Sequence, residues 1–326
     1  MGKAAAARKL AAAAAFGGGG LSVLGAGLYG VLRTEASLAR RAIGDAPDEA
    51  PPDSTGWYGR GRPGPAVKVA LLGDSSAAGY GVDRAVETPG AHLASGIAAG
   101  ADRRVHLRAF ARIGAQSSDL AGQIDRALLT EPDLTIILVG ANDVTHQVRP
   151  SQSVRHLGEG VRRLLEADSR VLVGTCPDLG TVKPIPPPLK QVARSWSRRL
   201  AAAQAIATVE EGGVAVSLGS ILGPDFAAAP ALLFGPDQFH PSAEGYRAVA
   251  EVLVPSALNA LGFGDDEPRR TRGEGTMPVA TAAVQAAKTP GTELGDKKGL
   301  WVELRRRARL RSVPEAPSED EVVSDA

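Results

Sequence analysis

Five short apolar segments alternate with longer segments of helical periodicity, and this alternation constrains the fold more than any other feature of the chain. The apolar segments cover residues 67–72, 105–110, 134–139, 170–175 and 214–218, and the helical candidates cover residues 89–99, 117–129, 153–167, 189–211 and 242–261. Each apolar segment is too hydrophobic for a strand with one face in water, which favours a parallel sheet covered on both faces. Strands that alternate with helices imply right-handed crossovers. The pattern therefore predicts an α/β fold of three layers, α/β/α, around a five-stranded parallel sheet.

The folded domain is predicted at residues 66–262, between flanking segments of different composition. Residues 1–43 contain an uncharged stretch, 10–32, which follows three basic residues and is long enough to cross a bilayer as a helix. We expect a membrane anchor there, with the domain outside the cytoplasm; a cleaved signal segment and a secreted protein are the alternative. Residues 44–65 are rich in proline and predict a linker, and the charged segment 263–326 predicts a disordered tail.

The composition narrows the classes of partner. The net charge is +1, so the chain as a whole carries no excess of positive charge for nucleic acid, and we expect no nucleic-acid partner. Cys176 is the only cysteine, which excludes an intrachain disulfide. No Cys/His spacing typical of a zinc site is present. An apolar content of 44% in 326 residues is enough for one sizeable core, and protein partners stay unknown at this stage.

Residues capable of catalysis follow four of the apolar segments. Ser75 lies in a turn of small residues after the first segment, and Gly114 and Asn142 come soon after the second and third. Asp237 and His240 share a loop that follows the fifth. Because the carboxyl ends of parallel strands meet at one edge of a sheet, we expect all of these residues at the same edge. A serine nucleophile needs a base within hydrogen-bond reach and a third group that orients the base, and the set contains both.

Four motifs resemble the sequence blocks of the SGNH, or GDSL-type, esterase and lipase family. They are Gly73-Asp74-Ser75, an isolated Gly114, Gly140-Ala141-Asn142-Asp143, and Asp237-Gln238-Phe239-His240. They occur in the family's order and span about residues 66–262. The resemblance implies the flavodoxin-like SGNH hydrolase fold, hydrolysis of esters, and a site without metal or cofactor.

The resemblance also implies a role for each residue of the set. Ser75 would attack the ester carbonyl, His240 would act as general base and then as general acid, and Asp237 would orient the imidazole. The backbone N–H groups of Ser75 and Gly114 and the side-chain amide of Asn142 would bind the oxyanion. The substrate would be a small-molecule or lipid ester, and an anchored enzyme would favour lipid or cell-envelope esters.

Two alternatives come from other functional classes. An acyl- or acetyltransferase on envelope glycans or lipids would use the same serine, histidine and aspartate but would deliver the acyl group to an alcohol. A non-catalytic scaffold anchored in the membrane would instead bind partners through its linker and tail. The intact set of Ser75, Gly114, Asn142, Asp237 and His240 counts against the scaffold. Asp143, beside Asn142, is interpreted as a residue that braces its loop.

Overall fold

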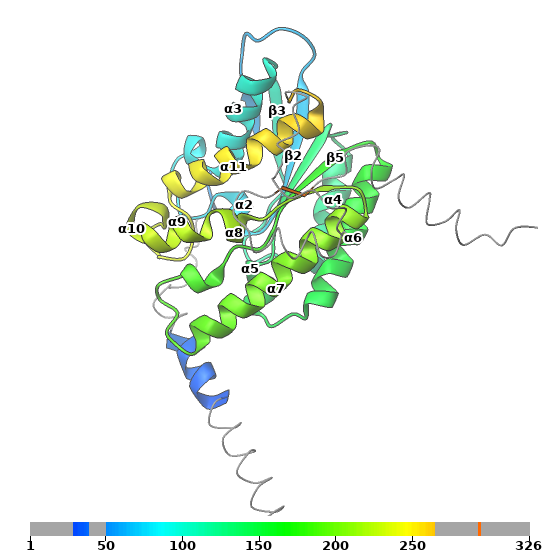
Figure 1. Cartoon of the computed structure of the whole chain (residues 1–326). Helices are drawn as coiled ribbons and strands as arrows, with labels where there is room; N and C mark the ends of the chain where they lie inside the picture. Colours follow the sequence, from blue (N-terminus) through cyan, green and yellow to red (C-terminus); the bar gives the residue numbers. More distant parts are fainter. Residues whose placement is uncertain (1–28, 39–49, 265–292, 295–326) are drawn as a thin grey trace, which may run out of the picture.

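The computed structural model describes residues 29–38, 50–264 and 293–294 (Figure 1). The predicted membrane segment, 10–32, lies outside these residues except for its last part, which begins a helix of residues 29–38. Within the described part of the chain, no helix is both long and apolar enough to cross a membrane. Most of the predicted tail, 263–326, also lies outside the described residues. The anchor and the disordered tail therefore stay predictions.

Five parallel strands form the centre of the sheet, as the sequence predicts. They are β2 Val67–Gly73, β3 Val105–Ala109, β4 Leu134–Leu138, β5 Arg170–Gly174 and β6 Val214–Val216. Their spatial order is β3-β2-β4-β5-β6, so the chain first builds the sheet on one side of β2 and then on the other. The carboxyl ends of β2 and β4 lie side by side where the order reverses, and open parallel sheets build their sites at such a point.

Helices cover both faces of the sheet and give the predicted three layers (Figure 1). On one face lie α3 Pro89–Ala101 and α11 Ala243–Leu261, and on the other lie α4 Leu120–Leu128, α6 Pro150–Glu166 and α7 Leu189–Glu210. Neighbouring strand residues point to opposite faces, so Leu71 packs in the core under α3 and α11, whereas Leu72 packs with α4 and α6. Both side chains are fully buried. This two-sided burial explains why the strands are continuous apolar segments in the sequence.

Two short antiparallel strands make the sheet seven-stranded instead of five-stranded. β1 Gly56–Tyr58 pairs with β3, and β7 Glu293–Leu294 pairs with β6. β1 lies within the segment predicted as a linker, and its side chains pack on the domain. The Trp57 ring stacks on His106 with centroids 4.5 Å apart, and Tyr58 Oη donates a hydrogen bond of 2.7 Å to Ser54 O. Residues 56–58 thus lie at the edge of the sheet, inside the segment 44–65 that was predicted as a linker.

Short helices occupy connections for which the sequence predicted no element. They are α2 Ser75–Ala78, α5 Ala141–Thr145, α8 Leu218–Ile221, α9 Gly223–Ala228 and α10 Pro230–Leu233, with single 3-10 turns at Ala85–Glu87 and Leu179–Thr181. A further 3-10 turn, Ser117–Asp119, lies directly before α4 and begins the segment 117–129 that was predicted as helical. α2 begins next to the end of β2, and α5 follows β4 closely. α8, α9 and α10 fill the connection from β6 to the loop that contains Asp237 and His240. These short helices therefore surround the sheet edge at which the candidate residues were expected.

Candidate active site

Ser75 is the first residue of α2, and β2 ends two residues before it at Gly73. Between them, Asp74 has an extended backbone, and its Oδ1 accepts a hydrogen bond of 2.9 Å from Ser76 N, which caps α2. The turn requires glycine at position 73, because its φ is +138° and a Cβ there would lie 1.8 Å from Leu138 O. This local sequence turns the chain sharply and places Ser75 at the carboxyl edge of the sheet.

Two buried glutamine side chains fix the strand ends around Ser75. Gln123 of α4 accepts a hydrogen bond of 2.7 Å from Gly73 N and donates one of 2.9 Å to Gly73 O. In the same way, Gln204 of α7 accepts from Cys176 N at 2.7 Å and donates to Val139 O at 2.9 Å. The amides satisfy main-chain groups that lose their strand partners where the sheet ends. Sequence reasoning missed both glutamines.

His240 connects Ser75 to Asp237. Its Nε2 lies 2.8 Å from Ser75 Oγ, and its Nδ1 lies 2.5 Å from Asp237 Oδ2. The other carboxylate oxygen, Oδ1, accepts hydrogen bonds of 3.0 Å each from the backbone N–H groups of Phe239 and His240. The three residues expected to act together therefore form one continuous hydrogen-bonded chain, in which the carboxylate is fixed through both of its oxygens.

Aromatic side chains enclose the imidazole of His240. The ring centroid of Tyr80 lies 4.4 Å from that of His240, and the centroid of Phe239 lies 4.9 Å away. Gly235 N donates a hydrogen bond of 2.8 Å to His240 O and closes the loop behind the side chain. These contacts restrict rotation of the imidazole, so its Nε2 stays directed at Ser75.

The pKa values of two carboxyl groups near Ser75 are shifted in opposite directions. Complete burial raises the pKa of Asp74 to about 6, despite the hydrogen bonds that this carboxylate accepts. Burial also acts to raise the pKa of Asp237, but the hydrogen bonds from His240 and from the backbone of Phe239 outweigh it, and the pKa lies below its usual value. Asp237 is thus ionised at neutral pH, as a group that orients and stabilises an imidazolium must be.

Asn142 lies next to the turn that contains Gly114. Its Nδ2 donates a hydrogen bond of 3.1 Å to Ala115 O, and an amide with two N–H groups keeps one for a ligand. The turn is attached to the end of β2, where Arg112 N donates 3.1 Å to Gly73 O. Gly114 has a φ of +75°, and a Cβ there would meet no described protein atom within 4 Å. The positive φ therefore favours glycine at position 114, whereas crowding by neighbouring protein atoms does not require it.

Asp143 braces the segments around this turn. Its carboxylate is buried and accepts hydrogen bonds from Ser117 N at 3.1 Å, from Ser117 Oγ at 3.2 Å and from Ser153 Oγ at 2.7 Å. These bonds join α5 to the turn before α4 and to α6. Because the carboxylate is occupied by three structural donors, the contacts agree with the interpretation of Asp143 as a brace.

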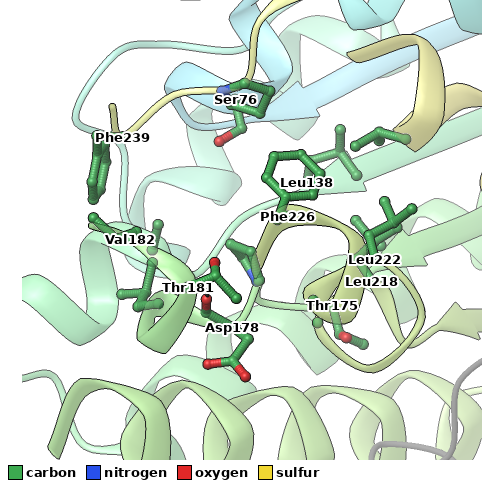
Figure 2. A pocket seen from close by; sticks show the side chains of 18 of the residues that line it. Ser76, Leu138, Thr175, Asp178, Thr181, Val182, Leu218, Leu222, Phe226 and Phe239 are labelled. Carbon is green, nitrogen blue, oxygen red and sulfur yellow. Dashed lines mark hydrogen bonds between the residues drawn. The ribbon is translucent and has the colours of Figure 1, made fainter. Parts of the chain in front are cut away.

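A pocket of about 90 Å³ lies beside the pair of Ser75 and His240 (Figure 2). The residues immediately before and after Ser75 line it, and so do the residues on either side of His240. The rest of the wall comes from the ends of β4 and β5, the loop after β5, α8, α9 and α11, and is mostly apolar. Among the residues that the structure describes, no group of three or more His, Cys, Asp or Glu side chains could hold a metal ion. A hydroxyl, an imidazole and a carboxylate beside an apolar pocket suit covalent and acid–base chemistry on a partly apolar substrate.

Comparisons with known proteins match the same part of the chain. Residues 71–248 match the model of the GDSL-like lipase/acylhydrolase family, and this range contains every predicted site residue. The chain is also 37% identical over 300 residues to a GDSL-like esterase of Mycobacterium tuberculosis, a match that covers 88% of this chain and 92% of the relative.

Solved structures resemble the folded domain at low sequence identity. An α/β hydrolase enzyme from the metagenome of Lake Arreo, Spain, has a TM-score of 0.48 at 19% identity, with 61% of this chain and 97% of that chain covered. A lipase/acylhydrolase from Enterococcus faecalis has a TM-score of 0.48 at 19% identity, with 62% and 99% covered.

Proposed function

The chain belongs to the GDSL-like lipase/acylhydrolase family, and from this premise we propose that it hydrolyses carboxylic esters through an acyl-serine intermediate on Ser75. Membership of this family supports ester hydrolysis in general. The observation that carries the assignment of roles is the hydrogen-bonded chain from Ser75 through His240 to Asp237. A weak nucleophile, a base and a group that orients the base are thereby within reach of one another.

In the first half of the reaction, Ser75 Oγ attacks the ester carbonyl carbon, and His240 Nε2 accepts the hydroxyl proton. The carbonyl electrons move onto the oxygen and form a tetrahedral intermediate. When the intermediate collapses, the bond to the alcohol oxygen breaks, and His240 returns its proton to the departing alcohol. In the second half, water attacks the acyl carbon and gives its proton to His240. The bond from the acyl carbon to Ser75 Oγ then breaks, His240 returns the proton to Ser75, and the carboxylic acid is released.

Asp237 keeps the imidazole in the tautomer that this sequence needs. Because Asp237 Oδ2 accepts the Nδ1 proton of His240, Nε2 is the nitrogen that is free to accept the proton of Ser75. The lowered pKa of Asp237 supports this role, since a negative carboxylate stabilises the imidazolium that forms in the transition state.

The oxyanion would be bound by the Ser75 and Gly114 N–H groups and the free N–H of the Asn142 amide. Asn142 and Gly114 lie in neighbouring segments, which the hydrogen bond from Asn142 to Ala115 O joins. The backbone of Arg112 attaches the same turn to Gly73, the last residue of β2. Donors fixed in this way require little reorganisation when charge develops on the substrate oxygen.

The proposal is tested with the purified full chain and p-nitrophenyl esters of graded acyl length. Ser75→Ala and His240→Ala should each lower kcat/KM by at least about a thousandfold with the fold intact, because the members of such a triad act as a unit. The matched control is Ser151→Ala, an exposed serine on α6. A fluorophosphonate should modify Ser75 and no other serine. Near wild-type hydrolysis by Ser75→Ala would reject the nucleophile, and transfer to an added alcohol as the main product would favour the acyltransferase alternative.

A further inference from the structure

The pocket beside Ser75 has an apolar wall and a polar far end. Leu138, Leu222 and Phe226 line its middle, as Figure 2 shows, and Thr175 and Asp178 lie further along it. The apolar wall suits the hydrocarbon part of an acyl group, because such a chain gains free energy when it leaves water. The polar far end requires a separate explanation.

The hydroxyl of Thr175 has no hydrogen-bond partner among the described residues, although the side chain is 1% exposed. Other polar groups of the pocket are paired: Asp178 accepts from Gly180 N at 2.8 Å and from Arg198 at 3.0 Å, and Thr181 Oγ1 donates to Asp178 O at 2.8 Å. Buried polar groups in native proteins are almost always paired, because an unpaired one costs free energy. Five described side chains have such an unpaired buried atom, and Thr175 is the one among them that lines the pocket.

The register of the sheet gives the distance from Thr175 to Asp74, the residue before Ser75. Gly73 of β2 pairs with Leu138 of β4, which pairs with Gly174 of β5, so Asp74 and Thr175 each lie one residue beyond the same row. Two strand spacings separate these positions, which amounts to roughly 10 Å. An extended acyl chain of six carbons spans about 6 Å, and a terminal hydroxyl with its hydrogen bond to Thr175 adds about 4 Å, so that together they cover this distance.

We propose that this pocket selects acyl groups of medium length that carry a hydroxyl near their far end, and that Thr175 Oγ1 binds this hydroxyl. The inference rests on the proposed ester hydrolysis and assigns the class of its acyl group. A ligand hydroxyl pairs the threonine hydroxyl as donor or acceptor, while its methylene groups contact the apolar wall. A site with a buried hydrogen-bonding group binds an analogue without the partner less well, since the buried group then stays unpaired.

The test compares p-nitrophenyl hexanoate with p-nitrophenyl 6-hydroxyhexanoate for the wild-type chain and for Thr175→Val. Valine keeps the shape and the β-branch that suit the end of a strand and removes only the hydroxyl. The wild type should prefer the hydroxylated ester in kcat/KM by about three- to tenfold, the range of one net hydrogen bond. Thr175→Val should abolish or reverse that preference, and Thr175→Ser should restore it.

Thr181→Val is the matched control, because Thr181 lines the same pocket but its hydroxyl already bonds to Asp178 O. It should change the two rates by the same factor. A wild-type enzyme that hydrolyses both esters equally well, or a Thr175→Val variant with the wild-type preference, would overturn the inference and leave ester hydrolysis standing. Hydrolysis of no ester in the graded series would instead reject the proposed function and the inference with it.

Discussion

Tyr246 Oη of α11 donates a hydrogen bond of 2.6 Å to Tyr80 O, although 166 residues separate them. Tyr80 N in turn donates to Ser75 O at 3.0 Å, and the Tyr80 ring packs against His240. The buried Tyr246 thus ties α11 to the segment that carries Ser75 and to the aromatic ring that packs against His240. The alignment of Ser75 with His240 therefore depends on a contact outside both of their loops.

Tyr246→Phe should weaken this tie without changing the shape of the side chain. We expect a loss of about 1 kcal/mol of stability, the net value of one hydrogen bond, and a fall in kcat of about threefold or more, because small misplacements of catalytic groups are costly. Urea unfolding and steady-state kinetics measure the two effects. Tyr58→Phe is the control, since Tyr58 Oη bonds to Ser54 O at the domain edge and should affect stability alone. An unchanged kcat for Tyr246→Phe would contradict the positioning role.

Asn142→Ala should lower kcat by about a hundredfold and change KM little. An oxyanion donor binds the developing negative charge more strongly than the ground-state carbonyl, so its loss appears in the chemical step. His146→Ala serves as the control, because His146 is exposed and its Nδ1 lies 2.8 Å from the Asn142 carbonyl oxygen without reaching the amide group. If the effect of Asn142→Ala were confined to KM, Asn142 would be a residue for substrate positioning.

Asp74 should make the stability depend on pH in an unusual direction. Burial raises its folded pKa to about 6 from a usual value of 3.8. Between these two pH values, the folded state therefore binds more protons than the unfolded state. The contribution of Asp74 is complete below about pH 3.8 and is lost as the pH rises through about 6. The stability of the wild type relative to Asp74→Asn should therefore fall by about 2 kcal/mol between pH 4 and pH 7.5.

Chemical denaturation of both proteins across this range measures the difference, and the subtraction removes groups common to both. Asp237, whose folded pKa is lowered, makes a contribution opposite in sign to that of Asp74. This contribution is the same in both proteins and cancels in the subtraction. Asparagine retains an acceptor for Ser76 N, so the cap of α2 survives the substitution. A difference that stays constant or grows with pH would mean that Asp74 is ionised in the folded state at low pH.

The buried central strands could be predicted from the sequence, whereas the strands at the edges and the short helices could not. β2 and β4 were predicted because both of their faces are buried and their sequences are almost entirely apolar. β3 is less uniform, since its His106 and Arg108 lie on a face that is only partly buried. β1 and β7 were missed because they have three and two residues and lie at the edges, where no apolar pattern is required. The turns of α8, α9 and α10 were missed because Gly223, Pro224 and Pro230 interrupt the periodic signal.

The site residues that lie in loops after parallel strands could be predicted from the sequence. Ser75, Asn142 and His240 follow strands directly or lie in the loop after the last parallel one, so the parallel arrangement alone brings them to one edge. Gln123 and Gln204 are polar residues on helices, and nothing in the sequence distinguishes them from solvent-facing ones. Their role exists only in contacts with main-chain groups about 30 to 65 positions away, which the fold creates.

The last prediction concerns Glu35, which lies before the domain in the helix of residues 29–38. Its Oε2 accepts a hydrogen bond of 2.8 Å from Leu189 N, the first N–H of α7, and the N-cap residue Pro188 provides no side-chain bond of its own. A carboxylate at a helix N-terminus pairs an otherwise free N–H group and interacts favourably with the helix dipole. α7 follows the loop after β5, part of which lines the pocket.

Glu35→Ala should therefore lower the free energy of unfolding by about 1 kcal/mol, as the loss of other helix caps does. Glu35→Gln should have a smaller effect, because it keeps an acceptor and loses only the charge, and Arg33→Ala on the exposed side of the same helix should have none. Removal of residues 1–43 should reproduce the loss of stability while hydrolysis of small soluble esters continues, because Ser75, His240 and Asp237 lie beyond the cut. Urea unfolding of the full chain and of these four variants decides the question. If the truncated chain and Glu35→Ala were as stable as the full chain, the helix before the domain would make no contribution to α7, and its contact with Leu189 would carry no energetic weight.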